Sequence, residues 1–385
     1  MWHAVPFRRR IITMGTFTIL FMLFFGLLIG LVAGFIMHRS DFCIAGMFRD
    51  FFLFGSLLKL RTLLLLIVSS MVLFELARYL GFLSLYPFPL IGSPSLTNVL
   101  GGFFFGIGMV LAGGCVVGTL YKMGAGSVLS AVAFAGLIIG SALYAEIYPW
   151  WSSIASATTL FRGKVTIPQI LNLPPLLLIS IITIIASWYF HRWHRQGDWV
   201  RPTLLTGSVQ PWQAALILSL LGVISYVTIG MPLGITTAYA KIAGSLEALF
   251  FSTHLQKLAY FKSLPLTYRL PVTGMQLSGG PGPELDAIAL IQFPVVAGIM
   301  LGGTLSAVLL NEFRMYVKLP WKHYLSAAIG GVIMGLASRM APGCNVWHLL
   351  GGIPILAAQS LLFVAGLFPG AWLGSLILSR YVIRQ

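Results

Sequence analysis

Charged residues are scarce in this chain, and acidic residues are the scarcest. Asp, Glu, Lys and Arg make up 9% of the 385 residues, against about 25% in soluble domains. This shortage excludes an ordinary water-soluble domain. Apolar runs of 18 or more residues recur along the whole length instead, which is typical of membrane-spanning helices. Because these runs do not alternate as barrel strands do, we expect an all-α polytopic membrane protein.

Cysteine is also scarce, with three residues at Cys43, Cys115 and Cys344 and no CxxC spacing. This odd number without CxxC spacing disfavours both a disulfide framework and a zinc site, so no metal is expected. Walker A, GxGxxG, HExxH and Ser-His-Asp patterns are absent as well. The sequence therefore predicts no ATPase and no other enzyme, and we expect no cofactor.

The lack of acidic residues leaves a formal net charge of +15. A nucleic-acid partner is one interpretation of such a charge. Basic residues that collect in loops and fix membrane topology explain the charge better. A positive interior that favours an anionic substrate is compatible with this explanation. We expect no nucleic-acid partner.

Nine segments are long and apolar enough to span a membrane. Four shorter apolar segments are expected to be re-entrant or buried, and the first span is too long for a cleavable signal peptide. The predicted spans are 11–37, 60–82, 98–114, 126–148, 171–191, 213–231, 287–310, 323–341 and 355–379. The short segments are 41–57, 116–124, 233–249 and 345–353.

Basic residues concentrate in segments 38–62, 192–201 and 311–322 and in the C-terminal tail. All four fall on one side if nine helices alternate, and the positive-inside rule makes that side the cytoplasm. The N-terminus then lies outside and the C-terminus inside, although the basic run 8–10 argues for the opposite. The uncharged loop 83–97 and the stretches 149–170 and 250–286 are expected outside.

Two Gly-rich runs, Gly101–Tyr121 and Gly330–Leu350, repeat each other. With an offset of 229, six of fifteen positions match, and both Cys115 and Cys344 are among them. We divide the chain into a first membrane repeat at 11–148, a connector with one helix at 149–212 and a second repeat at 213–381. The single connector helix gives the repeats opposite orientations, which is a device of transporters. The second repeat places Ile235 at the position of Cys43, next to Thr236 and Thr237.

Each repeat breaks its helix at the cysteine, in LAGGC through Gly113 and Gly114 and in MAPGC through Pro342 and Gly343. A short helix should begin directly after each cysteine, with its first amide groups unpaired and directed at the break. A thiol is a weak donor on a soft, polarizable atom. We therefore expect an anion path whose thiols suit a sulfur anion better than a hard anion such as sulfate.

Charged and polar residues near the breaks complete the predicted path. Lys122 and Arg339 could attract an anion, or they could extend to the membrane interface. His348 could face the ligand, although a histidine near a helix end is more often only hydrogen-bonded. The predicted path residues are Cys43, Cys115, Cys344, Gly114, Gly343, Arg49, Lys122, Arg339, Asn345 and His348.

Other conspicuous residues have structural interpretations. Glu75 and Arg78 are three apart on one helix and are expected to pair with each other. The paired glycines of the two repeats are expected to allow close helix packing rather than to bind a ligand. These are Gly102 and Gly106 in the first run and Gly331 and Gly335 in the second.

Three segments together resemble the YeeE/YedE family of bacterial inner-membrane proteins: SDFCIAGMFRDFFLFG, GGFFFGIGMVLAGGCVVGTLYKMGAGS and GGVIMGLASRMAPGCNVWHLLGGIP. The resemblance covers roughly residues 20–380 and includes Cys43, Cys115 and Cys344. It implies a pseudo-symmetric helical fold in the bacterial inner membrane. It also implies a narrow path in which thiosulfate passes between cysteine thiols. The implied partners are thiosulfate or a related sulfur anion, membrane lipid and a cytoplasmic sulfur-carrier protein.

Three alternatives to thiosulfate uptake stay open from the sequence. The family has a branch linked to selenium metabolism, so a selenium compound is a second candidate cargo. A membrane enzyme could pass sulfur through a cysteine persulfide if Arg49 or Lys122 activated the thiolate. A structural membrane protein without transport activity is the third alternative.

Overall fold

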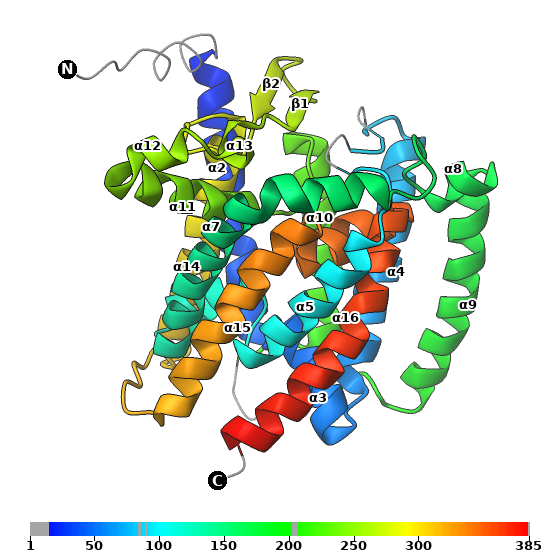
Figure 1. The fold of residues 1–385 in the computed structure, drawn as a ribbon. Coiled ribbons are helices and arrows are strands. Elements are labelled where there is room, and N and C mark those ends of the chain that lie inside the picture. Colours follow the sequence, from blue (N-terminus) through cyan, green and yellow to red (C-terminus); the bar gives the residue numbers. More distant parts are fainter. Residues whose placement is uncertain (1–14, 84–85, 89–90, 202–206, 384–385) are drawn as a thin grey trace.

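The apolar runs fold into long helices, because backbone groups inside a membrane must pair within their own segment. A computed structural model describes residues 15–83, 86–88, 91–201 and 207–383. Eight helices of this described part are long and apolar enough to cross a membrane, which confirms an all-α polytopic membrane protein. Figure 1 shows them as one bundle, with α9 at its edge beside α4.

The main helices are α2 (Thr16–Ser40), α3 (Ile44–Phe54), α4 (Leu58–Tyr79), α5 (Thr97–Leu111), α6 (Val116–Gly124), α7 (Val128–Ala157), α9 (Pro175–Arg195), α10 (Pro211–Ile229), α11 (Thr236–Phe250), α14 (Ala287–Leu309), α15 (Trp321–Met340) and α16 (Ala358–Ile377). Smaller elements are α8 (Ile167–Leu171), α12 (Ser252–Leu255), α13 (Ala259–Lys262), η1 (Trp347–Gly352), η2 (Ile353–Ile355) and η3 (Leu378–Ile383). Strands β1 (Leu266–Arg269) and β2 (Gln276–Gly279) form one antiparallel hairpin.

Most predicted helices lie within a few residues of those observed, with one clear error. Segment 149–170 was expected to be an outside loop, but α7 continues through Pro149 and ends at Ala157. Proline is tolerated inside a membrane helix because neighbouring groups satisfy the freed backbone. The boundary drawn at 148 therefore falls inside a helix. The segment predicted at 323–341 forms α15, which is not one of the eight apolar spans.

The N-terminal basic run 8–10, residues 11–14 of the first predicted span and Arg384 of the tail lie outside the described residues. The expected pair does form, since Arg78 Nε donates to Glu75 Oε2 at 2.9 Å.

The paired glycines bring helix backbones into contact, as predicted. A Cβ atom on Gly102 would lie 2.0 Å from the Phe363 carbonyl oxygen, and one on Gly331 would lie 2.3 Å from the Ala133 carbonyl oxygen. Only a residue without a side chain permits such an approach. Glycine therefore fixes the α5–α16 and α7–α15 pairs that surround the centre of the bundle.

Contacts between helices come in matched pairs. Helix α2 packs on α14 as α10 packs on α4, and α5 packs on α16 as α15 packs on α7. The short helices follow the same pattern, since α3 packs on α16 and α4 while α11 packs on α7 and α14. The two halves therefore correspond helix by helix, and replacing each helix by its counterpart turns each of these contacts into another observed contact. The corresponding pairs are α2 and α10, α3 and α11, α4 and α14, α5 and α15, α6 and η1, and α7 and α16.

Candidate functional site

Four short helical segments begin near the centre of the bundle, and a cysteine precedes three of them. Cys43 is the N-cap residue of α3, and Cys115 is the N-cap residue of α6. Cys344 begins the turn that leads into η1, and the His348 amide donates to its carbonyl at 2.9 Å. The fourth segment, α11, has Ile235 at its N-cap. The structure therefore shows the short helix expected after Cys115 and after Cys344.

The thiols of Cys43 and Cys115 lie side by side. Both sulfur atoms lie against the Cβ position of Gly118, and both residues are fully or almost fully buried. The Gly118 amide donates to Cys115 Sγ at 3.3 Å, as a helix N-cap requires. A Cβ atom on Gly118 would lie 2.9 Å from Cys43 Sγ. Gly118 therefore leaves the space that the two sulfur atoms occupy.

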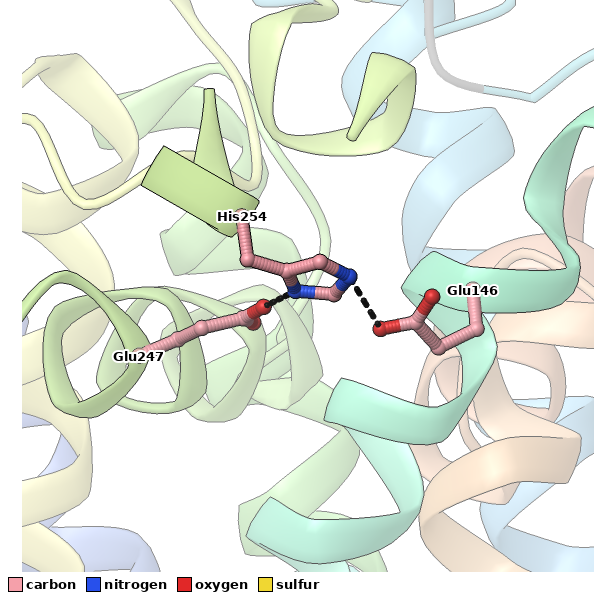
Figure 2. Close-up of side chains that lie close together, drawn as sticks. All are labelled: Glu146, Glu247 and His254. Atoms are coloured by element: carbon pink, nitrogen blue, oxygen red, sulfur yellow. Dashed lines mark hydrogen bonds and ion pairs between the residues drawn. The ribbon is translucent and has the colours of Figure 1, made fainter. Parts of the chain in front are cut away.

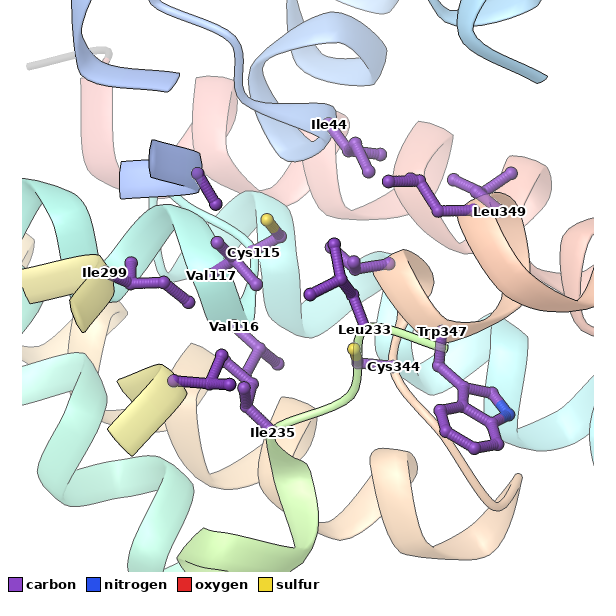
Figure 3. Close-up of a cluster of buried hydrophobic side chains, with 14 of the residues drawn as sticks. Ile44, Cys115, Val116, Val117, Leu233, Ile235, Ile299, Cys344, Trp347 and Leu349 are labelled. Carbon is purple, nitrogen blue, oxygen red and sulfur yellow. The ribbon is translucent and has the colours of Figure 1, made fainter. Parts of the chain in front are cut away.

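Cys344 lies at a narrow apolar point between the helix starts. It lines a central cavity of about 30 Å³ whose other walls are apolar side chains or backbone. Figure 3 shows Cys344 and Cys115 within one cluster of buried apolar side chains, with Val117, Leu233 and Ile235 among its other members. A volume of this size admits about one water molecule, so the described conformation is closed to a five-atom oxyanion.

Two larger cavities lie on either side of this constriction. Helix α14 connects them, because Gln292 lines one cavity of about 570 Å³ and Leu310, just past its end, lines another of about 590 Å³. Ile299, between these residues, lines the central constriction. A helix rise of 1.5 Å per residue separates Gln292 from Leu310 by about 27 Å. The cavities therefore open toward opposite ends of the bundle.

The first cavity is the Arg339 vestibule, named after the buried arginine in its wall. Arg339 donates to the Thr237 hydroxyl at 3.2 Å and to the Tyr260 hydroxyl at 3.4 Å, and it also donates to the hydroxyl of Thr236. No carboxylate in the described part of the chain pairs with it. The side chain is buried, so a positive charge with neutral partners faces the vestibule. Gly343 lines the same cavity.

The second cavity is the Lys122 vestibule, whose wall also contains His38, Arg39, Arg201 and Arg314. Lys122 Nζ donates to the Gly113 carbonyl at 2.8 Å, which is one of the carbonyls freed by the helix break. The charge that remains is positive, although Asp41 and Glu312 also line this cavity. An anion that leaves the constriction on this side would enter a basic environment.

Several buried polar groups around the path lack a hydrogen-bond partner among the described residues. Arg339 Nε, Asn345 Nδ2 and Trp347 Nε1 can only donate, and the Tyr121 hydroxyl and His348 Nε2 are unpaired too. Unpaired buried donors are rare and point to an absent acceptor such as a water or an ion. Arg339 and Trp347 line one vestibule and Tyr121 lines the other, and this placement fits the passage of an anion, which is rich in acceptors.

Asn345 and His348 are fully buried next to Cys344. The Asn345 side chain accepts from the Val346 amide at 2.9 Å. His348 Nδ1 bonds the Ser360 hydroxyl at 2.9 Å, and its ring stacks on Phe363 with centroids 4.1 Å apart. One nitrogen of each side chain stays unpaired in this part of the chain.

The structure does not bring Arg49 to the thiols. Its guanidinium pairs with Asp50 at 2.8 Å and lines a separate cavity of about 310 Å³. Gly114 lies directly before Cys115 but has an ordinary conformation, whereas Gly113 has φ +70° and turns the chain. In the second repeat Gly343 itself has φ +137°, and a Cβ atom there would lie 2.4 Å from the Trp347 ring.

Sequence reasoning missed four residues that line the vestibules or lie between the thiols. Gly118 was hidden in an apolar helix, and Tyr121 was taken as ordinary apolar sequence. The sequence marks Thr236 only as a neighbour of Ile235, and it gives no signal for Trp347. The repeat alignment held the one available signal, because it placed Thr236 beside the position that corresponds to Cys43.

Comparisons with known proteins point to one family. The family described as "Sulphur transport" matches residues 39–373. A protein of Spirochaeta thermophila named thiosulfate transporter TsuA is 28% identical over 361 residues, covering 91% of this chain and 99% of that protein. Thiosulfate transporter TsuA of Escherichia coli K12 is 24% identical, covering 92% and 94%. Probable transporter YedE of Salmonella typhimurium is 28% identical over 178 residues, covering 44% and 42%.

Proposed function

The chain belongs to the sulphur transport family, and on that premise we propose that it carries thiosulfate, or a close sulfur oxyanion, into the cytoplasm through a path lined by Cys43, Cys115 and Cys344. The observation that carries this proposal is the order of groups along the path. Arg339 lines one vestibule, Cys344 lines the apolar constriction, and basic residues line the other vestibule, where Tyr121 lies beside the Cys43 thiol.

Each part of this path has a separate role. Arg339, with no carboxylate partner in the described chain, binds the anion in its vestibule through charge-assisted hydrogen bonds. The apolar constriction blocks hydrated ions, because an ion that sheds its water there finds too few polar groups to replace that water. Thiols then donate weak hydrogen bonds to the anion, which suits passage because tight binding would prevent release.

Passage requires the constriction to widen, since its cavity of about 30 Å³ is smaller than thiosulfate. We expect the four short helices α3, α6, α11 and η1 to move, because each begins near the constriction. The matched helix contacts support two inverted repeats, whose relative movement would open one vestibule and then the other.

We place the Lys122 vestibule at the cytoplasmic side of the bacterial inner membrane. Arg39, Arg201 and Arg314 line it, and cytoplasmic loops carry an excess of such residues. The Arg339 vestibule then faces outward, the N-terminus lies outside and the C-terminus lies inside.

We also propose transport without covalent chemistry. A persulfide enzyme needs a positive neighbour that stabilises the thiolate, and Arg49, one of the two candidates, is paired with Asp50 away from the thiols. Mass spectrometry of the purified protein after exposure to thiosulfate tests this point. A persistent cysteine persulfide would favour the enzyme instead.

Uptake of labelled thiosulfate into vesicles containing only this protein tests the main proposal. We expect Cys115→Ala and Cys344→Ala to lower uptake at least tenfold at equal protein content. Arg49→Gln is a matched control that removes a candidate residue away from the path, and it should transport like the parent. Equal uptake by the parent and both alanine variants would show that the thiols do not line the path. Faster uptake of selenite or selenosulfate than of thiosulfate would favour the selenium alternative.

A further inference from the structure

Glu146, Glu247 and His254 form a cluster that the transport path does not use. Glu146 belongs to α7, Glu247 to α11 and His254 to α12, and suitable ligand atoms of the three lie within 4.8 Å of one another. Figure 2 shows the imidazole between the two carboxylates. Three helices thus contribute one group each to a single point near the Arg339 vestibule, whose wall contains Tyr144 of α7.

The two carboxylates lie at different distances from the imidazole of His254. His254 Nδ1 lies 2.6 Å from Glu247 Oε1, which is a hydrogen-bonding distance. Glu247 is the more buried carboxylate, with a side-chain exposure of 13%. Such a bond holds the proton on Nδ1 and leaves the lone pair of Nε2 available. The same carboxylate–histidine arrangement orients histidine ligands in metal sites and raises their basicity.

On the opposite side, His254 Nε2 lies 3.6 Å from Glu146 Oε1. This separation is too long for a hydrogen bond. It is close to the roughly 3.3–3.5 Å that separates two ligand atoms of one tetrahedral ion bound at about 2.0–2.2 Å. We propose that His254 Nε2 and the Glu146 carboxylate bind a zinc-class divalent ion, with Glu247 positioning the imidazole.

The donor set decides which ions fit. One imidazole nitrogen and carboxylate oxygens suit Zn²⁺ and Co²⁺, whereas Mg²⁺ and Ca²⁺ prefer oxygen ligands alone. The side chains of His254 and Glu146 are each 47% exposed, so water can complete the coordination shell. A bound ion would tie α12 to α7 just before α13, whose Tyr260 forms part of the vestibule wall.

Metal binding to the tag-free, full-length protein in detergent tests the proposal. His191 and His194 are exposed and three apart on α9, so they could hold zinc weakly by themselves. All variants therefore carry His191→Gln and His194→Gln. Calorimetry with Zn²⁺ gives the affinity and stoichiometry, and the visible absorption of Co²⁺ reports a tetrahedral nitrogen- and oxygen-bound ion.

We expect one ion per chain in this background. His254→Gln and Glu146→Gln should each weaken zinc binding at least tenfold, and Glu247→Gln should weaken it about 10- to 100-fold because the imidazole loses its orienting partner. His323→Gln, at a histidine that lines a different cavity, is the control and should bind zinc like the background protein.

Two results would overturn the proposal. Zinc that fails to bind the background protein would leave the cluster as an ion pair between three helices. Equal zinc affinity in the His254→Gln variant would place the metal elsewhere. Neither result depends on thiosulfate transport, so the proposed function would be unaffected.

Discussion

Cys43 and Cys115 direct their sulfur atoms at the same glycine. The Gly118 amide donates to Cys115 Sγ at 3.3 Å, and the position of a Cβ atom on Gly118 is 2.9 Å from Cys43 Sγ and 3.4 Å from Cys115 Sγ. Both thiols are thereby held at the first turn of α6, beside the central constriction. The absence of a side chain at Gly118 is what allows two sulfur atoms to share this position.

Gly118→Ala should therefore impair transport without unfolding the protein. The added methyl group enters the space between the two thiols. Its distance of 2.9 Å to Cys43 Sγ is too short, so this sulfur atom must move. We expect thiosulfate uptake into vesicles to fall at least tenfold. Gly222→Ala is the matched control, because a Cβ atom there meets nothing closer than 4.0 Å. Normal uptake by Gly118→Ala would show that the thiol pair does not contact the cargo.

Arg339→Gln should weaken anion binding in the vestibule. A hydrogen bond to a charged group contributes about 1.5–3 kcal/mol, or roughly 10- to 100-fold in affinity. We expect the KM for thiosulfate to rise by that factor, and Arg339→Lys should retain part of the affinity. Arg162→Gln removes an exposed arginine and should leave KM unchanged. An unaltered KM in Arg339→Gln would exclude this guanidinium as the entry site.

The local features of this site could be predicted from the sequence, while its tertiary contacts could not. Helix α6 occupies the residues predicted for it, because a Gly-Gly break and an N-terminal cysteine are local signals. Thr236 and Thr237 reach Arg339 only because α11 packs beside α15, and no short-range pattern encodes that approach. The span predicted at 126–148 ends directly before Pro149, but α7 continues through this proline to Ala157.

Lys241 and Asp286 should matter for stability far more than the exposed pair Arg201–Asp41. Lys241 Nζ lies 2.8 Å from Asp286 Oδ2, and the two side chains are 1% and 5% exposed. Removing one partner of a buried pair costs about 3–5 kcal/mol, whereas an exposed pair contributes about 0–1 kcal/mol. We expect Lys241→Met to lower the unfolding temperature by several degrees and Arg201→Gln to leave it almost unchanged.

Thermal unfolding in detergent, followed by tryptophan fluorescence at one fixed scan rate, measures both variants, since unfolding of such proteins is commonly irreversible. The charge change is also controlled, because each variant removes one positive charge. Similar unfolding temperatures for Lys241→Met and the parent would mean that the loop before α14 does not depend on this pair.

Tyr121→Phe should separate transport from stability. The Tyr121 hydroxyl lies beside the Cys43 thiol and meets no stronger hydrogen-bond partner in the described part of the chain. Removing a buried hydroxyl whose one neighbour is a weakly bonding thiol costs a fold little stability. If this hydroxyl donates to the anion as it leaves the thiol pair, the variant should keep the parental unfolding temperature and lose uptake several-fold.

Tyr268→Phe provides the opposite control. Its hydroxyl donates to the Ile229 carbonyl at 2.9 Å and does not line the path. Loss of this bond leaves a buried carbonyl unpaired and should cost about 1–3 kcal/mol of stability, with unchanged uptake per folded molecule. Uptake should fall without a loss of stability only in a variant that lacks a donor to the anion. If Tyr121→Phe transports like the parent, the Tyr121 hydroxyl does not donate to the anion.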